Sequence, residues 1–298
     1  MEFTSFSDVI FNPVAQSKFV HTISAGYVTG AIFVLSISAG YLLRGRHIAL
    51  ARRSMVVAAS FGLASALSVV VLGDQSGYTT GQNQKMKIAA IEAMWTTEKA
   101  PASFTLFGIP DQKNRVTHFE IRMPWVLGII ATRSLDTPVP GIDELVNTAQ
   151  TRIRSGMLAY AALLRLRVDK SDADAQAAFE AHREDLGYAL LLKKYTPAVT
   201  DATAAQIELA ASDTVPRVVP LFWSFRIMVA LGFFFILLFA TAFWLASTHR
   251  LSRHPAFLKL CVLALPLPWI AGELGWYVAE CGRQPWTIDG VLPTFLSA

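Results

Sequence analysis

Four side chains that carry or can gain a charge lie within or at the ends of long apolar stretches. They are His21, Arg226, Glu273 and Glu280. A charged or titratable group inside a lipid bilayer is costly, so such residues usually mark functional sites. An imidazole or a carboxylate in such a place could ligate a metal or transfer a proton. Each of the four is therefore a candidate for chemistry, and the elements that carry them decide which chemistry is open to them.

The apolar stretches are long enough to cross a membrane. The ranges 19–43, 54–72, 227–247 and 260–279 contain a single Asp, Glu, Lys or Arg between them, Glu273. A helix of about 20 residues crosses the hydrocarbon core, and a backbone in lipid must satisfy its own hydrogen bonds. With 53% hydrophobic and 16% charged residues, the 298-residue chain is also too apolar for an ordinary soluble protein. The predicted fold class is an all-α integral membrane protein with four transmembrane helices.

The charges of the connecting segments predict the orientation. The loop between the first two helices carries four arginines and no acid, and the loop between the last two carries three basic residues and no acid. Basic loops stay in the cytoplasm, so a large insertion between the second and third helices is expected outside. This insertion has 16 Lys and Arg against 17 Asp and Glu. The net charge of +4 therefore reflects topology and indicates no nucleic-acid partner.

These patterns divide the chain into a first helix pair at 1–73, an extracytoplasmic region at 74–217 and a second helix pair at 218–298. Within the middle region, periodicity and breaker residues predict short elements. Helices are expected at 86–95, 142–168, 171–195 and 202–211. Strands are expected at 104–107 and 116–121, and turns at 73–77 and 109–111.

The fourth apolar stretch has two further features. Pro266 and Pro268 should kink or loosen its inner half, because proline lacks the N–H that a helix interior needs. Cys261 and Cys281 are 20 residues apart on it. On a continuous helix this is about 30 Å, so a disulfide between them is excluded by geometry.

Two residues near the outer ends of different helices could ligate one metal. His21 lies close to the outer end of the first helix, and Met228 lies in the outer half of the third. An imidazole nitrogen and a thioether sulfur form an axial pair for a low-spin haem. Gly26 and Gly30 form a GxxxG pattern that permits close approach of a helix or a flat cofactor. The alternatives are an interfacial histidine and a methionine that packs in the core.

The fourth helix carries a polar stripe. Trp276, Glu280 and Arg283 follow Glu273 at offsets of 3, 7 and 10, so the four share one helix face. A carboxylate can ligate a high-spin iron, and an arginine one turn further on can pair with a haem propionate. The alternative is a carboxylate–arginine pair that only neutralises itself at the membrane interface.

Lys87 and Glu92 lie on the predicted short helix that ends near Trp95. A cation and a carboxylate beside aromatic residues could hold and deprotonate a quinol headgroup. The alternative is an ordinary solvated helix surface. Residue types alone leave both interpretations open.

Six segments of the sequence resemble subunit I of the cytochrome bd quinol oxidases, and the resemblance covers essentially the whole chain. They are KFVHT at 18–22, GYVTG at 26–30, VLGDQSG at 71–77, FTLFGIPDQ at 104–112, GIIATR at 128–133 and GRQPW at 282–286. This family oxidises quinol at the outer face of the membrane, reduces dioxygen to water at haem d and takes protons from the cytoplasm. The resemblance implies a multi-pass, haem-binding protein of the bacterial cytoplasmic (inner) membrane, with its long loop on the periplasmic side.

The resemblance also implies roles for single residues. His21 and Met228 match the axial ligands of a low-spin haem b, and Arg226 lies beside that haem. Lys87 and Glu92 match the residues that bind and oxidise ubiquinol or menaquinol in the external loop, usually called the Q loop.

On the fourth helix, the resemblance assigns haem contacts. Glu280 matches the ligand of a high-spin haem b, Trp276 matches an aromatic near the haem pair, and Arg283 matches a propionate partner. Glu273 and Asp74 remain open as members of a proton path.

The sequence departs from the family's pattern in length. The family's subunit has more membrane spans than the four found here, and the histidine that ligates haem d belongs to helices with no counterpart in the 298 residues. We therefore expect the chain to act as a quinol:oxygen oxidoreductase only as part of a complex, with subunit II and small accessory subunits as partners. Alone it should be inactive.

A non-redox membrane receptor or sensor, with the region 74–217 binding a ligand, is the alternative function. The His21/Met228 pair and the stripe on the fourth helix favour the redox interpretation, because a sensor has no need of them. A reduced-minus-oxidised visible spectrum separates the two classes.

Overall fold

The computed structural model describes residues 5–297 and is mostly helical. By length and composition, four helical segments could cross a membrane: Val14–Leu43, Ile48–Asn83, Val218–Ser247 and Pro255–Cys281. Each contains one of the expected apolar stretches. The chain forms two compact units. The first unit comprises the chain up to Thr79 and Trp223–Trp276, and the second comprises Thr80–Phe222 and the chain from Tyr277 on.

Long helices build the first unit. They are α2 (Pro13–Leu43), α3 (Ile48–Asn83), α10 (Val218–Ser247), α11 (Pro255–Leu263) and α12 (Leu267–Cys281), with a short α1 (Phe6–Ile10) before them. Residues 80–83 of α3, 218–222 of α10 and 277–281 of α12 belong to the second unit. Helix α2 begins where the Asn12 side chain accepts hydrogen bonds from the backbone N–H groups of Val14 and Ala15, at 2.9 and 3.3 Å. Such a cap satisfies donors that the first helical turn leaves without partners.

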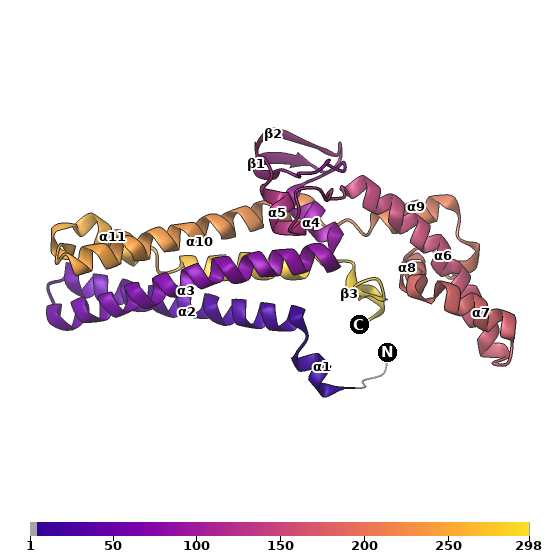
Figure 1. Ribbon diagram of the computed structural model, residues 1–298, viewed down its shortest axis with the longest axis horizontal. Helices are drawn as coiled ribbons and strands as arrows, with labels where there is room; N and C mark the ends of the chain where they lie inside the picture. Colours follow the sequence, from indigo (N-terminus) through magenta and orange to yellow (C-terminus); the bar gives the residue numbers. More distant parts are fainter. Residues whose placement is uncertain (1–4, 298) are drawn as a thin grey trace. The chain divides into compact units, whose positions relative to one another are not determined.

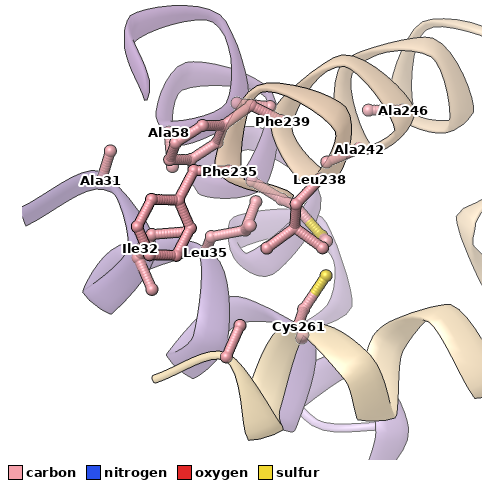
Figure 2. Packing of buried hydrophobic residues seen from close by; sticks show 14 of the residues in the cluster. Ala31, Ile32, Leu35, Ala58, Phe235, Leu238, Phe239, Ala242, Ala246 and Cys261 are labelled. Carbon is pink, nitrogen blue, oxygen red and sulfur yellow. The ribbon is translucent and has the colours of Figure 1, made fainter. Parts of the chain in front are cut away.

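The core of the first unit lies between α2, α3, α10 and α11 (Figures 1 and 2). Aromatic and branched side chains alternate there with alanines, so that the helices approach closely. Gly62 of α3 is one such contact, because a Cβ atom there would collide with the ring of Phe239. The buried hydroxyl of Ser36 donates a 2.7 Å hydrogen bond to the backbone carbonyl of Cys261, which joins α2 to α11.

The fourth apolar stretch is interrupted as its prolines predict. Helix α11 ends at Leu263 and α12 begins at Leu267, with Pro266 and Pro268 at the junction. Both cysteines are free. The junction leaves α12 as a separate helix that carries the polar stripe.

The predicted turn at 73–77 is wrong, because α3 continues as a helix to Asn83. The segment contains glycines but no proline, so nothing in it removes a helical hydrogen bond. Tertiary packing then uses a glycine of the extended helix. In the second unit, a Cβ atom on Gly81 would lie 2.6 Å from the backbone oxygen of Ala131, which belongs to α5 (Val126–Thr132).

The second unit contains the short helix α4 (Lys85–Glu92) and an antiparallel hairpin of β1 (Phe104–Asp111) and β2 (Val116–Met123). The predicted strands are confirmed, but the predicted turn at 109–111 is wrong. Those residues pair with β2, and the chain reverses between Asp111 and Val116. The Asp111 carboxylate fixes this reversal by accepting hydrogen bonds from the N–H groups of Lys113 and Asn114, at 3.0 and 3.1 Å.

Around the long helix α6 (Ile142–Val168) pack α7 (Ala173–His182), α8 (Leu186–Leu190) and α9 (Ala204–Ser212) (Figure 1). The prediction for α6 is confirmed to the residue, and α9 lies where a helix was expected. The helix predicted over 171–195 is broken into α7, α8 and flanking 3₁₀ turns, and Asp172 rather than Ser171 caps its start.

The chain from Tyr277 on joins this helical group through a small hairpin of β3 (Trp286–Ile288) and β4 (Leu292–Pro293). Arg152 of α6 forms a 2.6 Å ion pair with Asp185 and stacks 4.2 Å over the ring of Tyr188. That ring lies 5.0 Å from the ring of Trp286. Neither this hairpin nor the stack that holds it was predicted from the sequence.

Candidate functional site

His21 lies on α2 with its ring against α3. A Cβ atom on Gly73 would be 3.4 Å from the Cε1 atom of His21, about van der Waals contact, so the imidazole packs directly beside this glycine. The Nδ1 atom of His21 is buried and has no hydrogen-bond partner among residues 5–297. A buried polar atom without a partner costs about 1–3 kcal/mol. A group bound at Nδ1 itself would offset that cost, whereas a metal bound through Nε2 would leave it in place.

Met228 lies on α10, and its sulfur faces α12. A Cβ atom on Gly275 would be 3.0 Å from the Sδ atom, which is closer than real Cβ contacts allow without adjustment. Arg226, two residues earlier on α10, is only 8% exposed. In the first unit, the Arg226 side chain is therefore buried and that of Met228 is partly buried. His21 and Met228 pack against different helices, each at a glycine.

The polar stripe of α12 is only partly as expected. Glu273 and Trp276 lie on the helix with exposed side chains, Trp276 at 63%. Glu280 is in its last turn, but α12 ends at Cys281, so Arg283 lies in the following turn and not on the helix face. The predicted four-residue face is wrong at Arg283, because Gly282 and the bond Gln284–Pro285 come directly after the helix.

Glu280 and Arg283 nevertheless meet. The guanidinium Nη2 donates to the Glu280 carboxylate at 2.6 Å, and both side chains are a little over one-third exposed. The Nε atom of Arg283 is buried and, in the described part of the chain, has no hydrogen-bond partner. The Nη2 atom of the guanidinium therefore pairs with the carboxylate, while the Nε–H group is left for an acceptor such as a propionate. This geometry fits both the haem interpretation and the simple ion pair.

Lys87 is buried, at 6% exposure, and reaches the end of α12. Its Nζ atom donates a 3.2 Å hydrogen bond to the backbone oxygen of Ala279, the residue before Glu280. Helix carbonyls at a C-terminus lack partners within the helix and attract a cation. Lys87 thus brings α4 next to the carboxylate of the stripe, within the second unit.

Glu92 is also buried, at 4% exposure, and is held by the hairpin. One of its carboxylate oxygens accepts a hydrogen bond from the backbone N–H of Thr105 in β1, at 3.1 Å. Neither Lys87 nor Glu92 is on a solvated helix surface, so that alternative is wrong. They are five residues apart on α4 and are anchored to different elements, α12 and β1.

Charged side chains of β2 lie near Glu92, which belongs to α4. Arg122 pairs with Glu120 at 2.7 Å and lies 3.8 Å from a carboxylate oxygen of Glu98. The hydrogen bond to Glu120 is the largest cause that raises the pKa of Arg122, and the negative charges of Glu98 and Glu92 act in the same direction. The region around the Glu92 carboxylate therefore contains a permanent positive charge.

Two residues that were not predicted from the sequence affect the structure of these sites. Gln112 donates from its amide nitrogen to the Pro216 oxygen at 3.3 Å and accepts from the N–H of Val218 at 3.0 Å, so the hairpin holds the first turn of α10. Gly282 lies against the Lys87 side chain. Both residues fall in segments that carry the family resemblance, which was the only signal that could have found them.

Comparisons with known proteins identify the family of the chain. The family model for cytochrome bd terminal oxidase subunit I matches residues 1–298. Subunit 1 of the cytochrome bd-II ubiquinol oxidase of Escherichia coli (strain K12) is 43% identical over 295 residues, which is 99% of this chain and 57% of that protein. Subunit 1 of the cytochrome bd ubiquinol oxidase of Bacillus subtilis (strain 168) is 28% identical over 293 residues, which is 98% of this chain and 51% of that protein.

Among solved structures, the bd oxidase from Geobacillus thermodenitrificans has a similar fold. Its TM-score is 0.63 at 22% identity, and the match covers 96% of this chain and 52% of that one. The chain thus spans about half the length of the relatives it matches.

Proposed function

Because the chain belongs to the family of cytochrome bd terminal oxidase subunit I, we propose that it supplies the quinol-oxidising site and the b-type haem ligands of a quinol:oxygen oxidoreductase. The observation that carries the proposal is the placement of Lys87. Its ammonium group binds the backbone beside Glu280, so the candidate quinol residues and the candidate haem carboxylate belong to one packed region.

For the low-spin haem b, we propose His21 and Met228 as axial ligands with Arg226 close by. The burial of Arg226 and the position of each proposed ligand beside a glycine, His21 at Gly73 and Met228 at Gly275, support this assignment. When bound, the haem supplies an iron that accepts and passes on single electrons. The protein contributes a soft thioether ligand, which raises the reduction potential of such a haem.

For the high-spin haem b, we propose Glu280 as ligand, Arg283 as propionate partner and Trp276 as an adjacent aromatic. The unpartnered Nε atom of Arg283 supports its role, because a propionate oxygen would satisfy it with a charge-assisted hydrogen bond. The haem d ligand is expected from a part of the family's subunit that these 298 residues do not match.

For quinol oxidation, we propose that Glu92 takes a hydroxyl proton while Lys87 orients the headgroup. Oxidation of a quinol releases its hydroxyl protons with its electrons, so a positioned carboxylate lowers the barrier. The N–H of Thr105 fixes the Glu92 carboxylate, and the Ala279 oxygen fixes the Lys87 ammonium group. Both residues are therefore held by backbone atoms, which change little when a ligand binds.

The same proposal also gives the location, the partners and the substrates of the protein. The protein is a multi-pass component of the inner membrane, with the region 74–217 on the outer side. It assembles with subunit II and with small accessory subunits, and its substrates are ubiquinol or menaquinol and dioxygen. The basic loops between the candidate membrane helices support this orientation.

The test uses the complete oxidase that contains this chain. We expect Glu92→Gln to reduce oxygen uptake driven by a short-chain ubiquinol by roughly 10²- to 10⁴-fold, the usual contribution of a general base. Uptake driven by tetramethyl-p-phenylenediamine should persist, because that donor releases electrons without needing a base. Glu208→Gln, on the exposed surface of α9, is the matched control.

An equal loss with both donors would overturn the assignment of Glu92 to quinol oxidation. The receptor alternative has its own test. If purified membranes containing the complex give no haem bands in a reduced-minus-oxidised spectrum, the redox function is wrong for this protein.

A further inference from the structure

Gly282 lies at a close contact between two elements of the second unit. It is buried and directly follows the end of α12. A Cβ atom built on Gly282 would lie 2.9 Å from both the Cγ and the Cε atoms of Lys87. Real Cβ atoms essentially never come that close to another heavy atom. Any larger residue at 282 must therefore displace the Lys87 side chain or the backbone around it.

The path of Lys87 explains why this contact matters. Its aliphatic part crosses Gly282, and its Nζ atom then reaches the Ala279 oxygen at 3.2 Å. A lysine at a helix C-terminus gains from the partial negative charge there. With a side chain on residue 282, the lysine could not follow this path to the same carbonyl.

We infer that Gly282 is a positioning residue for quinol oxidation, because the lack of a side chain there lets Lys87 reach the end of α12 beside Glu280. This inference rests on the proposed role of Lys87 at the quinol headgroup. It adds that the headgroup site is formed jointly by α4 and the turn after α12. The same turn also holds Arg283, whose guanidinium pairs with Glu280.

The test is Gly282→Ala in the complete oxidase. We expect the KM for a short-chain ubiquinol to rise by roughly tenfold or more, since a displacement of about 1 Å can cost up to 10²-fold. The kcat with tetramethyl-p-phenylenediamine and the haem spectrum should stay unchanged. Gly272→Ala is the matched control, because a Cβ atom at that position of α12 has nothing within 4 Å in this chain.

A double-mutant cycle separates an effect through Lys87 from a local distortion, because the added Cβ atom would also lie 2.5 Å from the Val278 oxygen. On a Lys87→Ala background the side chain that is displaced has gone. Gly282→Ala should then add no further loss, which is the non-additivity expected of a coupled pair. Further loss in the double variant, or an unchanged KM in Gly282→Ala when Lys87→Ala impairs quinol oxidation, would overturn the inference.

Two further outcomes are decisive. If Gly282→Ala fails to assemble but the double variant with Lys87→Ala assembles, the contact with Lys87 is the cause and the inference holds. If neither assembles, the Val278 contact dominates and the inference is wrong. A normal ubiquinol KM in Lys87→Ala alone would instead remove the proposed role of Lys87 itself.

Discussion

The candidate site residues of the first and second units are held in different ways. In the first, the Nδ1 atom of His21 has no hydrogen-bond partner among the described residues, and the sulfur of Met228 faces a glycine. In the second, Lys87 and Glu92 are each bound to a backbone atom of another element. Arg283 is intermediate, because one of its nitrogens is paired and another is not.

This difference teaches how the two regions could serve one reaction. The first unit places the candidate ligands His21 and Met228 beside glycines, which suits a group that is added after folding. The second unit holds the candidate quinol residues Lys87 and Glu92 through backbone atoms, which suits a substrate that enters and leaves. Four predictions test this comparison, in order of decreasing effect.

The largest effect is expected for Met228→Leu, which keeps the volume of the side chain but removes its sulfur. The haem spectrum should change from low-spin to high-spin, or its reduction potential should fall, because thioether ligation raises it. Redox titration of the visible bands in the complete oxidase measures this. Met55→Leu, in the core of α3, is the control, since such swaps usually cost less than about 1.5 kcal/mol. An unchanged spectrum in Met228→Leu would exclude the sulfur as a ligand.

The second prediction concerns the stack in the second unit. Arg152→Ala removes the ion pair with Asp185 and the cation–π contact with Tyr188. Partly exposed contacts of these kinds contribute about 0.2–1 kcal/mol each, so the hairpin β3–β4 should open more often. Hydrogen exchange should become several-fold faster at Trp286 and its neighbours. Arg154 is exposed and lies two residues further along α6, so Arg154→Ala should leave the exchange rate of the hairpin unchanged. If both variants exchange equally, the stack does not hold the hairpin.

A smaller effect is expected at the end of α4. Ala93 ends this helix in the left-handed conformation, with φ of 50°, where a Cβ atom costs about 1–2 kcal/mol. Ala93→Gly should therefore stabilise the turn between α4 and the hairpin and slow its hydrogen exchange. Ala90→Gly, inside the helix, should do the opposite by about 1 kcal/mol. Destabilisation by Ala93→Gly would mean that packing of the methyl group outweighs its backbone strain.

The smallest effect is a pH dependence at the start of α7. The hydrogen bond from the N–H of Ala175 is the largest cause that holds the pKa of Asp172 below its ordinary value of 3.8. The carboxylate therefore stabilises α7 above pH 3.8, and this contribution is lost as the pH falls below that value through the lower pKa of the folded state. The protection factors of α7, corrected for the pH dependence of intrinsic amide exchange, should fall over that range. Asp172→Asn keeps a cap that cannot titrate and should abolish the change; the same fall in this variant would contradict the assignment.

The sequence by itself determined most of the elements. The long apolar runs predict the candidate membrane helices because a bilayer requires about 20 consecutive apolar residues. The amphipathic pattern over 142–168 gives α6, and the β-branched and aromatic residues of β1 and β2 give strands. Proline explains the break between α11 and α12. The candidate ligands and quinol residues came from rare polar groups in these elements together with the family resemblance.

Only the tertiary structure decided where those elements end and which residues meet. Helix α3 continues through its glycines, and α12 stops before Arg283. The contact of Lys87 with Ala279 joins residues 192 positions apart, and the hairpin of β3 and β4 is held by Tyr188 from another element. The physical reason is that periodicity and propensity report interactions within a few residues. The path of Lys87 across Gly282 depends on the packing of α4 against the end of α12, for which the chain carries no local signal.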